Sequence, residues 1–443
     1  MNALVSAPVE RIDGVIRVPG DKSISHRAVI LGAVANGTTE INGFLPGEDC
    51  LATLAAFSAM GIDIERPSET AVQIHGCGLN GLSAPTTPLD MGNSGTAMRL
   101  LSGLMAGQKF DSTLTGDASL MRRPMDRVAD PLRAMGAEIV TDNGCPPLAI
   151  TGNQRLHEID YVMPMPSAQV KSALLLAGLY ATGPVRITEP AVTRDHTERM
   201  LAAFGLPVHR EENRVTLPAG GPLTATRIDV PGDLSSAAFF ILAACLADEG
   251  ELVLDHVGLN PTRTGILRIF ELMQANIEVQ PQTDAGGEPV GRIIVRPCQL
   301  RGAEIRPEIV PLAIDEFPLV FVAAALAKGE TVISGATELR HKESDRIQVM
   351  AEGLKALGAE IEEHADGAVI RGGKLSAGTI DSGGDHRVAM AFAVGAVAAE
   401  GPIRIIDTKN VATSFPGFVE SARLIGLDIR ADNGLKPDQK SND

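Results

Sequence analysis

Aromatic side chains are scarce in this chain, which has two tyrosines, twelve phenylalanines and no tryptophan. With an aromatic share of only 3%, it lacks the rings on which single-stranded nucleic acids stack. Positive charge is also in deficit, because 39 lysines and arginines face 55 aspartates and glutamates, for a net charge of -16. Nucleic acids and anionic membranes bind to basic faces, so neither is expected as a partner. A site for an anion must therefore be a local group of cations.

The cysteines show no pairing pattern. All five are far apart, with no C-x-x-C pair, which is typical of reduced thiols in a cytoplasmic protein. No group of histidines, cysteines and carboxylates has the spacing of metal ligands, so no metal is expected. The first residues lack the regions of a signal peptide, and apolar runs such as residues 388–399 are too short to cross a bilayer. We therefore expect a cytoplasmic location.

One turn is written twice in the chain. Residues 18–27 read VPGDKSISHR and residues 230–239 read VPGDLSSAAF, and both have the Pro-Gly turn, Asp and Ser of a helix start. Only the first copy carries cations, Lys22 and Arg27. Cations in a first helical turn oppose the helix dipole. Together with the free N–H groups of the helix start, they predict an anion-binding site.

Two series of helix-like segments recur along the chain. Six apolar, alanine-rich runs each close on a glycine, about 70 residues apart, at Gly37, Gly107, Gly183, Gly250, Gly329 and Gly401. Six amphipathic segments alternate with them, and five have a glycine where the helix ends, at Gly61, Gly136, Gly205, Gly358 and Gly426. The fourth copy has Gln274 and Ala275 there instead.

This periodicity predicts an α/β (α+β) fold with two domains. Each domain would hold three βαβαββ repeats, with the apolar helices enclosed in a shell of sheets. The two VPGD turns divide the six copies into three and three. We expect a first domain over residues 20–228, a second over residues 229–433 completed by residues 1–19, and a polar tail at residues 434–443.

Polar residues gather at the starts of the apolar helices, which predicts an interdomain cleft for small polyanions. Asp315 precedes a strongly apolar run, where desolvation raises a carboxyl pKa unless cations oppose it, so Asp315 is a candidate base. The run RHKESDR (340–346) resembles a solvated, ion-paired helix face, but its place after a strand favours a function. Arg99 and Lys171 are either ligands or snorkelling tips of buried helices. Asp49 is expected to be an N-cap.

Nine motifs, in order, carry a resemblance to a known family. They are GDKSISHR, GNSGTAMR, LMRRP, PSAQVKSA, TRDHTE, AIDEFP, KESDR, DHRVAM and TSFP, between about residues 11 and 430. Together they resemble the 5-enolpyruvylshikimate-3-phosphate synthases, members of the enolpyruvyl transferases. The resemblance implies a monomer without metal or organic cofactor. It also implies transfer of the enolpyruvyl group of phosphoenolpyruvate to the 5-hydroxyl of shikimate 3-phosphate, with release of phosphate, in aromatic amino-acid biosynthesis.

The resemblance also implies roles for individual residues. Those matched to shikimate 3-phosphate are Lys22, Ser23, Arg27, Ser167, Gln169, Arg194, Asp315 and Lys342. Those matched to phosphoenolpyruvate are Lys22, Gly95, Arg123, Gln169, Arg346 and Arg387. We assign Asp315 as the base toward the 5-hydroxyl and Glu343 as the proton donor, with Lys22 a rival for that second role.

The motifs depart from one branch of the family at residues 413–416, where TSFP stands in place of a lysine-containing motif. Another branch includes forms tolerant of glyphosate, a competitor of phosphoenolpyruvate, and those forms have alanine where this chain keeps Gly95. We therefore expect glyphosate to inhibit, and Gly95→Ala to weaken the inhibition.

Three rival functions stay open. A UDP-N-acetylglucosamine enolpyruvyl transferase typically has a cysteine in the loop that corresponds to residues 116–124, and none is present. An RNA 3'-phosphate cyclase is disfavoured by the acidic balance and by the lack of a nucleotide-binding glycine motif. A repeat protein that only binds anions would not need Asp315 and Glu343 beside its cations.

Overall fold

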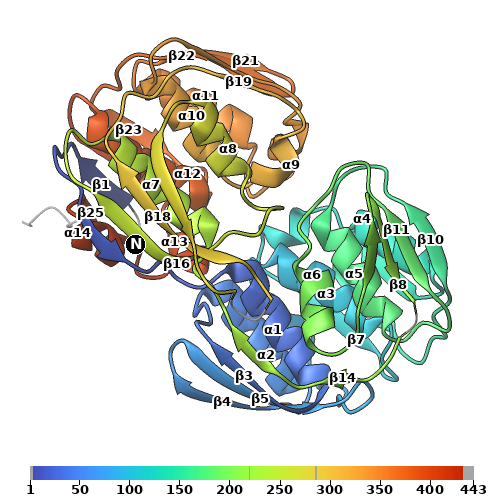
Figure 1. Cartoon of the computed structure of the whole chain (residues 1–443). Coiled ribbons are helices and arrows are strands. Elements are labelled where there is room, and N and C mark those ends of the chain that lie inside the picture. The colour runs from blue at the N-terminus through green and yellow to red at the C-terminus, as the bar shows by residue number, and fades with distance from the viewer. Residues whose placement is uncertain (1–2, 219, 285–286, 433–443) are drawn as a thin grey trace, which may run out of the picture. The chain divides into compact units, whose positions relative to one another are not determined.

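The computed structural model describes residues 3–218, 220–284 and 287–432, and the chain forms two compact units within it (Figure 1). The N-terminal unit holds residues 19–232 and 283–290, and the C-terminal unit holds residues 1–18, 233–282 and 291–443. Residues 283–290 thus belong to the N-terminal unit, whereas the repeat pattern had assigned them to the second domain.

Three sheets form among the described residues of the N-terminal unit. The first has the order β14 (Leu223–Thr224), β3 (Ala35–Asn42), β5 (Ala71–Cys77), β4 (Asp63–Ser68), and β15 (Arg227–Asp229) also pairs with β3. The second has the order β6 (Leu89–Asp90), β7 (Ser112–Thr115), β9 (Cys145–Thr151), β8 (Glu138–Asp142). The third has the order β10 (Ile159–Val162), β11 (Val185–Thr188), β13 (Arg214–Leu217), β12 (His209–Glu211).

The C-terminal unit repeats this pattern. Its sheets have the orders β17 (Asn276–Pro281), β18 (Val290–Arg296), β16 (Leu252–Gly258), β2 (Gly14–Ile16); β19 (Glu304–Ile305), β20 (Glu330–Ile333), β22 (Gly367–Arg371), β21 (Glu360–His364); and β23 (Gly378–Asp381), β24 (Ile403–Ile406), β1 (Ala3–Ala7), β25 (Asp428–Asp432). The start of the chain therefore supplies a strand to two of these sheets, because β1 pairs with β24 and β25, and β2 pairs with β16.

The six apolar runs form the buried helices. They are α1 (Lys22–Val34), α3 (Gly95–Met105), α5 (Ala168–Gly178), α7 (Leu234–Leu246), α10 (Phe317–Leu326) and α12 (His386–Gly395). In the N-terminal unit α3 packs against α5, and in the C-terminal unit α12 packs against α7 and α10. All of α10 from Phe317 to Ala325 is buried, as expected of a helix that is apolar on every side. The predicted α/β architecture of repeated units around buried helices is confirmed.

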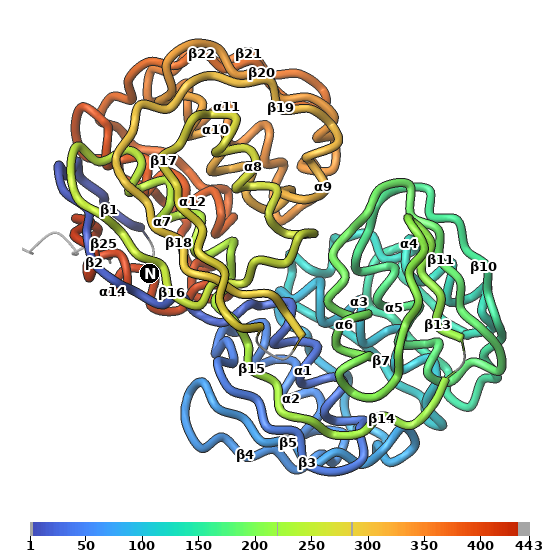
Figure 2. Tube along the Cα trace, in the orientation of Figure 1, coloured from blue at the N-terminus to red at the C-terminus, as the bar shows by residue number. Residues whose placement is uncertain are grey.

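The amphipathic series forms a second set of helices. They are α2 (Glu48–Ala59), α4 (Asp126–Ala134), α6 (His196–Ala203), α8 (Gly265–Leu272), α11 (Arg346–Ala356) and α14 (Phe418–Leu424). Short helices complete the chain: η1 (Leu120–Arg122), α9 (Val310–Ala313), η2 (Thr337–His341), η3 (Ala396–Ala398) and α13 (Val411–Ser414). The trace in Figure 2 follows these elements along both units. Within the part of the chain that is described, no helix has both the length and the hydropathy needed to cross a bilayer.

The two VPGD turns pair with each other. Gly20 forms an antiparallel bridge with Gly232, and the N–H of Asp21 donates to the carbonyl of Pro231 at 2.8 Å. Asp21 caps α1 by accepting from the N–H of Ile24 at 2.9 Å. A Cβ on Gly20 would lie 1.8 Å from the carbonyl oxygen of Gly43, so only glycine fits at this crossing.

Candidate functional site

The start of α1 holds the first group of predicted ligands. Lys22 forms an ion pair with Asp49 of α2, while Gly47, not Asp49, is the N-cap of α2. The expectation that Asp49 caps a helix was therefore wrong, because its carboxylate serves Lys22 instead. The carbonyl of Ser23 accepts a hydrogen bond from Nη1 of Arg27 at 2.9 Å, which ties two predicted ligands of shikimate 3-phosphate together.

Arg27 is fixed by two further helices. Its Nε donates to Thr197 Oγ1 at 2.6 Å and its Nη2 donates to Ser172 Oγ at 2.8 Å, although the residue is only 4% exposed. Burial lowers the pKa of Arg27 to about 10, a loss that the carboxylate of Glu198 partly offsets. The guanidinium is thus charged near neutral pH, and two hydroxyls and a backbone carbonyl hold it, which suits it to bind a phosphate.

A second group surrounds the start of α3. A Cβ built on Gly95 would lie 3.0 Å from Nη1 of Arg99 and 3.2 Å from Nη1 of Arg123. Arg123 donates to Oδ1 of Asn93 at 2.7 Å, and Arg99 donates to Oε1 of Gln169 at 2.7 Å. The structure therefore brings Gly95, Arg123 and Gln169 together, and Arg99 belongs to this group rather than reaching out to solvent.

The start of α5 carries Ser167, whose hydroxyl accepts from the N–H of Val170 at 3.3 Å as the N-cap. Arg194 lies on the loop between β11 and α6 and is partly exposed. Lys171 is fully buried instead, bound to Glu189 at 3.1 Å and to Glu198 at 2.8 Å. Lys171 is therefore neither a ligand nor a snorkelling tip.

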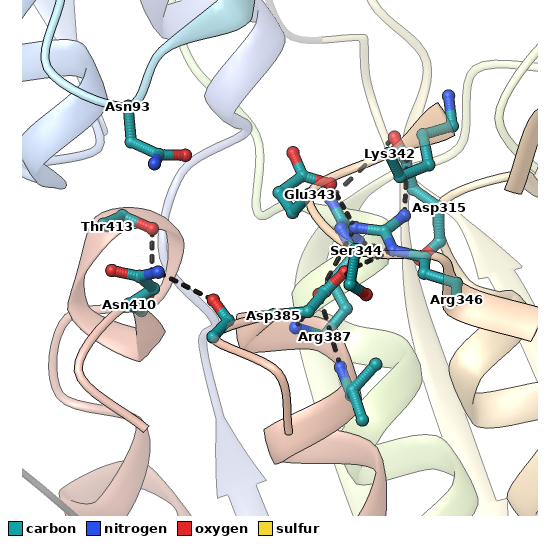
Figure 3. A network of polar contacts seen from close by, with 12 residues as sticks. Asn93, Asp315, Lys342, Glu343, Ser344, Arg346, Asp385, Arg387, Asn410 and Thr413 are labelled. Carbon is teal, nitrogen blue, oxygen red and sulfur yellow. Dashed lines mark hydrogen bonds and ion pairs between the residues drawn. The ribbon is translucent and has the colours of Figure 1, made fainter. Parts of the chain in front are cut away.

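In the C-terminal unit the predicted residues meet around Arg346 (Figure 3). Arg346 is 1% exposed, its Nη2 donates to Glu343 Oε2 at 2.6 Å, and its Nη1 lies 3.6 Å from Asp315 Oδ1. Its Nε donates to Asp385 Oδ2 at 2.7 Å. Burial alone would lower the pKa of Arg346, but the surrounding carboxylates raise it above its ordinary value. Arg346 is thus a buried, permanent cation beside both predicted catalytic carboxylates.

Asp315 lies between two guanidiniums. Besides Arg346, Nη2 of Arg387 is 3.9 Å from Asp315 Oδ2, and Nη1 of Arg387 donates to the backbone carbonyl of Asp315 at 3.3 Å. Lys342 directly precedes Glu343 in the chain. Its side chain is 21% exposed, and its Nζ lies 3.9 Å from Oε1 of Glu338. Burial lowers the pKa of Lys342, and Asp315 and Glu338 oppose that shift. Arg346 and Arg387 thus supply the positive charge that a carboxylate beside an apolar run needs.

Comparison with known proteins identifies the family. The family model for EPSP synthase (3-phosphoshikimate 1-carboxyvinyltransferase) matches residues 6–422 of this chain. The chain belongs to the EPSP synthase family. The family inferred from the nine motifs is confirmed, and with it the expectation of an enzyme of this transferase class.

Relatives agree over nearly the whole chain. A 3-phosphoshikimate 1-carboxyvinyltransferase of Methylococcus capsulatus is 61% identical over 425 residues, which cover 96% of this chain and 97% of the relative. One of Nitrosococcus oceani is 58% identical and covers 97% of both chains. The solved EPSP synthase from Acinetobacter baumannii superposes with a TM-score of 0.87 at 51% identity, covering 97% of this chain and 100% of that one.

Two sets of contacts in this EPSP synthase family member were not inferred from its sequence. Asp385 accepts from the N–H of Arg387 at 2.9 Å as the N-cap of α12 and also binds Arg346. Its place directly before a helix in the DHR motif was the signal that could have identified it. The TSFP segment (413–416) follows Asn410, whose Nδ2 donates to the carbonyl of Gly384, on the loop that leads to Arg387, at 2.7 Å.

Potential metal ligands lie elsewhere. Among the residues that the structure describes, one group could offer three ligand atoms to an ion: Asp63, Glu65 and His75, on β4 and β5. Both carboxylates are exposed, and neither strand carries a predicted site residue.

Proposed function

We propose that this chain transfers the enolpyruvyl group of phosphoenolpyruvate to the 5-hydroxyl of shikimate 3-phosphate and releases phosphate. The observation that carries the proposal is the arrangement around Arg346, a buried cation within 3.6 Å of Asp315 and bonded to Glu343. An anionic substrate drawn to this cation would lie beside two carboxylates able to move protons. The family membership and the identity of 61% to a named enzyme support the same reaction.

The proposed ligands of shikimate 3-phosphate are mostly hydroxyl and cationic groups of the N-terminal unit. They are Lys22, Ser23, Arg27, Ser167, Gln169, Arg194, Asp315 and Lys342. The buried, charged Arg27 supports the assignment, because three helices hold its guanidinium where a bound anion would compensate its desolvation.

The proposed ligands of phosphoenolpyruvate are dominated by arginines. They are Lys22, Gly95, Arg123, Gln169, Arg346 and Arg387. Gly95 supports the assignment, because its missing Cβ leaves the guanidiniums of Arg99 and Arg123 open to a ligand at the start of α3.

In the proposed reaction a proton adds to the methylene carbon of phosphoenolpyruvate, and the 5-hydroxyl attacks the neighbouring carbon and gives its proton to Asp315. The tetrahedral intermediate then loses phosphate and the added proton. Glu343 must be protonated to act as the donor, whereas Arg346 favours its carboxylate form. An anionic ligand that competes for Arg346 would free Glu343 for this role. Lys22, bound to Asp49, is the rival donor.

Further properties belong to the proposal. The three-repeat domains would span residues 20–228 and residues 229–433 plus 1–19, close to the two units, which differ from these bounds at residue 19 and at residues 229–232 and 283–290. The five free cysteines support a cytoplasmic location, and the protein would act as a monomer without metal or organic cofactor. Glyphosate would compete with phosphoenolpyruvate.

The test is phosphate release from the two substrates by the wild type and by Asp315→Ala. We expect the variant to lose a factor of about 10² to 10⁴ in kcat, the usual contribution of a general base. Asp428→Ala, which removes a carboxylate from an exposed pair with Arg430, serves as control and should match the wild type. Release with UDP-N-acetylglucosamine in place of shikimate 3-phosphate would favour the alternative enolpyruvyl transferase. No release by the wild type with either acceptor would falsify the proposal.

A further inference from the structure

The second VPGD turn, which lacks the cations of the first, contributes to a buried polar group in the C-terminal unit. Asp233 accepts a hydrogen bond from Nη2 of Arg263 at 3.1 Å, and the same nitrogen donates to Ser235 Oγ at 2.5 Å. The hydroxyl of Ser235 donates to Oε1 of Glu316. These four side chains belong to residues no more than 5% exposed. We name Ser235, Arg263 and Glu316 the support triad.

Glu316 connects this triad to the candidate site. It follows Asp315 directly, and its Oε1 lies 3.8 Å from Arg263 and 3.9 Å from Nη1 of Arg387. The same Nη1 donates to the backbone carbonyl of Asp315 at 3.3 Å. Arg387 is therefore held by two consecutive acidic residues, one of which is itself held by Ser235 and Arg263.

The energetics make Glu316 depend on these partners. A buried carboxylate loses several kcal/mol of hydration, which only good pairing and hydrogen bonds return. Glu316 is 2% exposed, and its Oε2 has no hydrogen-bond partner among the described residues, so Oε1 carries all of its compensation. Removing the Ser235 hydroxyl or the Arg263 charge would let the carboxylate move, and Arg387 and the Asp315 backbone would move with it.

We propose that the support triad positions Arg387 and Asp315 for the transfer reaction, so that its members are positioning residues of the site. The inference rests on the proposed function. It gives the second VPGD turn a role that its uncharged sequence does not show. The geometry supports a role beyond folding, because the same nitrogen of Arg387 lies beside Glu316 and donates to the backbone carbonyl of the candidate base Asp315.

The test compares Ser235→Ala and Glu316→Gln with the wild type in steady-state phosphate release. Both changes keep side-chain volume nearly constant, and Ser236→Ala is the matched control, a buried serine next in α7 that takes no part in the triad. We expect kcat to fall about 10-fold in Ser235→Ala and about 10- to 100-fold in Glu316→Gln, the scale of a displaced catalytic group, with KM for shikimate 3-phosphate within about twofold.

The pH profile separates positioning from a merely structural role. Glu316→Gln removes a negative charge near Arg387, so the site becomes more positive and favours ionised Asp315. The acid limb of the kcat profile should therefore move to lower pH in Glu316→Gln and stay unchanged in Ser236→Ala.

The outcomes decide between the two proposals. If the wild type is inactive, the proposed function fails. If the wild type is active and both triad variants keep its kcat and its acid limb, the positioning role alone is overturned. A loss of thermal stability in Ser235→Ala with unchanged kcat overturns it as well.

Discussion

Nε of Arg346 donates to Oδ2 of Asp385 at 2.7 Å, and neither side chain is more than 1% exposed. Asp385→Ala would leave Nε of a buried guanidinium without its counter-charge, with Glu343 and Asp315 still beside the Nη atoms, and α12 without its cap. We expect a loss of about 3–5 kcal/mol in the free energy of unfolding from the broken ion pair. Asp385→Asn can still accept at the helix cap and should lose less. Urea denaturation of both variants checks this, and wild-type stability in Asp385→Ala would refute it.

The start of α3 makes Gly95 a specificity position. An alanine there would place its Cβ 3.0 Å from Arg99 and 3.2 Å from Arg123, so one guanidinium must shift. We expect Gly95→Ala to raise KM for phosphoenolpyruvate and to weaken glyphosate inhibition by about 10-fold or more, since each 1.4 kcal/mol of lost binding is tenfold.

The measurement is the glyphosate inhibition constant in competition with phosphoenolpyruvate. Gly373→Ala is the control, because a Cβ there meets nothing within 4 Å and its φ is not in the left-handed region. Undiminished inhibition of Gly95→Ala would show that the added methyl group does not reach the ligand.

The sixfold repeat could be predicted because it depends on short-range patterns. The run 317–325 is apolar on every side, so its burial follows from its own composition. Gly358 follows the end of α11 in a left-handed conformation, which depends only on neighbouring residues. Those patterns placed the starts of the buried helices, and with them Gly95 and Arg387.

The charge partners could not be predicted, because they depend on how distant helices pack. Asp49 looks like a cap from its neighbours, and only the position of α1 beside α2 shows that it binds Lys22. Glu316 likewise gains its role from Ser235, 81 residues earlier. Sequence spacing carries no signal at such separations.

Lys171 forms ion pairs that are buried, so replacing it should lower the free energy of unfolding. Its ammonium is 0% exposed and contacts Glu189 at 3.1 Å, Glu198 at 2.8 Å and the carbonyl of Thr193 at 3.3 Å. Lys171→Met would leave two buried carboxylates short of a cation, and we expect it to destabilise the protein by about 3–5 kcal/mol. Lys374→Met breaks a pair whose lysine is 78% exposed and should cost no more than about 1 kcal/mol. Similar unfolding midpoints for the two variants would contradict this.

His26 should make stability depend on pH. Burial lowers its pKa well below the ordinary value of 6.5, and Lys22 and Arg27 lower it further. Below pH 6.5 this histidine binds a proton in the unfolded chain but stays neutral in the folded protein. The free energy of unfolding therefore falls as the pH drops toward the folded pKa. The slope approaches about 1.4 kcal/mol per pH unit.

The check is urea denaturation of wild type and His26→Gln from about pH 7.5 to about 5.5, where the variant should lose this part of the slope. His364→Gln, at an exposed histidine, should keep it. Equal slopes in the wild type and His26→Gln would mean that the buried ring accepts its proton in the folded state.

Gln274 is the one exception in the series of helix-ending glycines. It adopts a φ of 60°, where Gly61, Gly136, Gly205, Gly358 and Gly426 adopt φ values of 85° to 100°. A left-handed conformation costs a residue with a Cβ about 1–2 kcal/mol, and a glycine instead loses about 0.5–1 kcal/mol of unfolded-chain entropy. Because Gln274 is exposed, its removal sacrifices no buried contact. Gln274→Gly should therefore stabilise the protein by up to about 1 kcal/mol. The reverse change at the matching position, Gly358→Ala, should destabilise it by about the same amount. Thermal denaturation measures both effects. If both substitutions destabilise the protein, Gln274 makes a stabilising contact that outweighs the strain of its left-handed conformation.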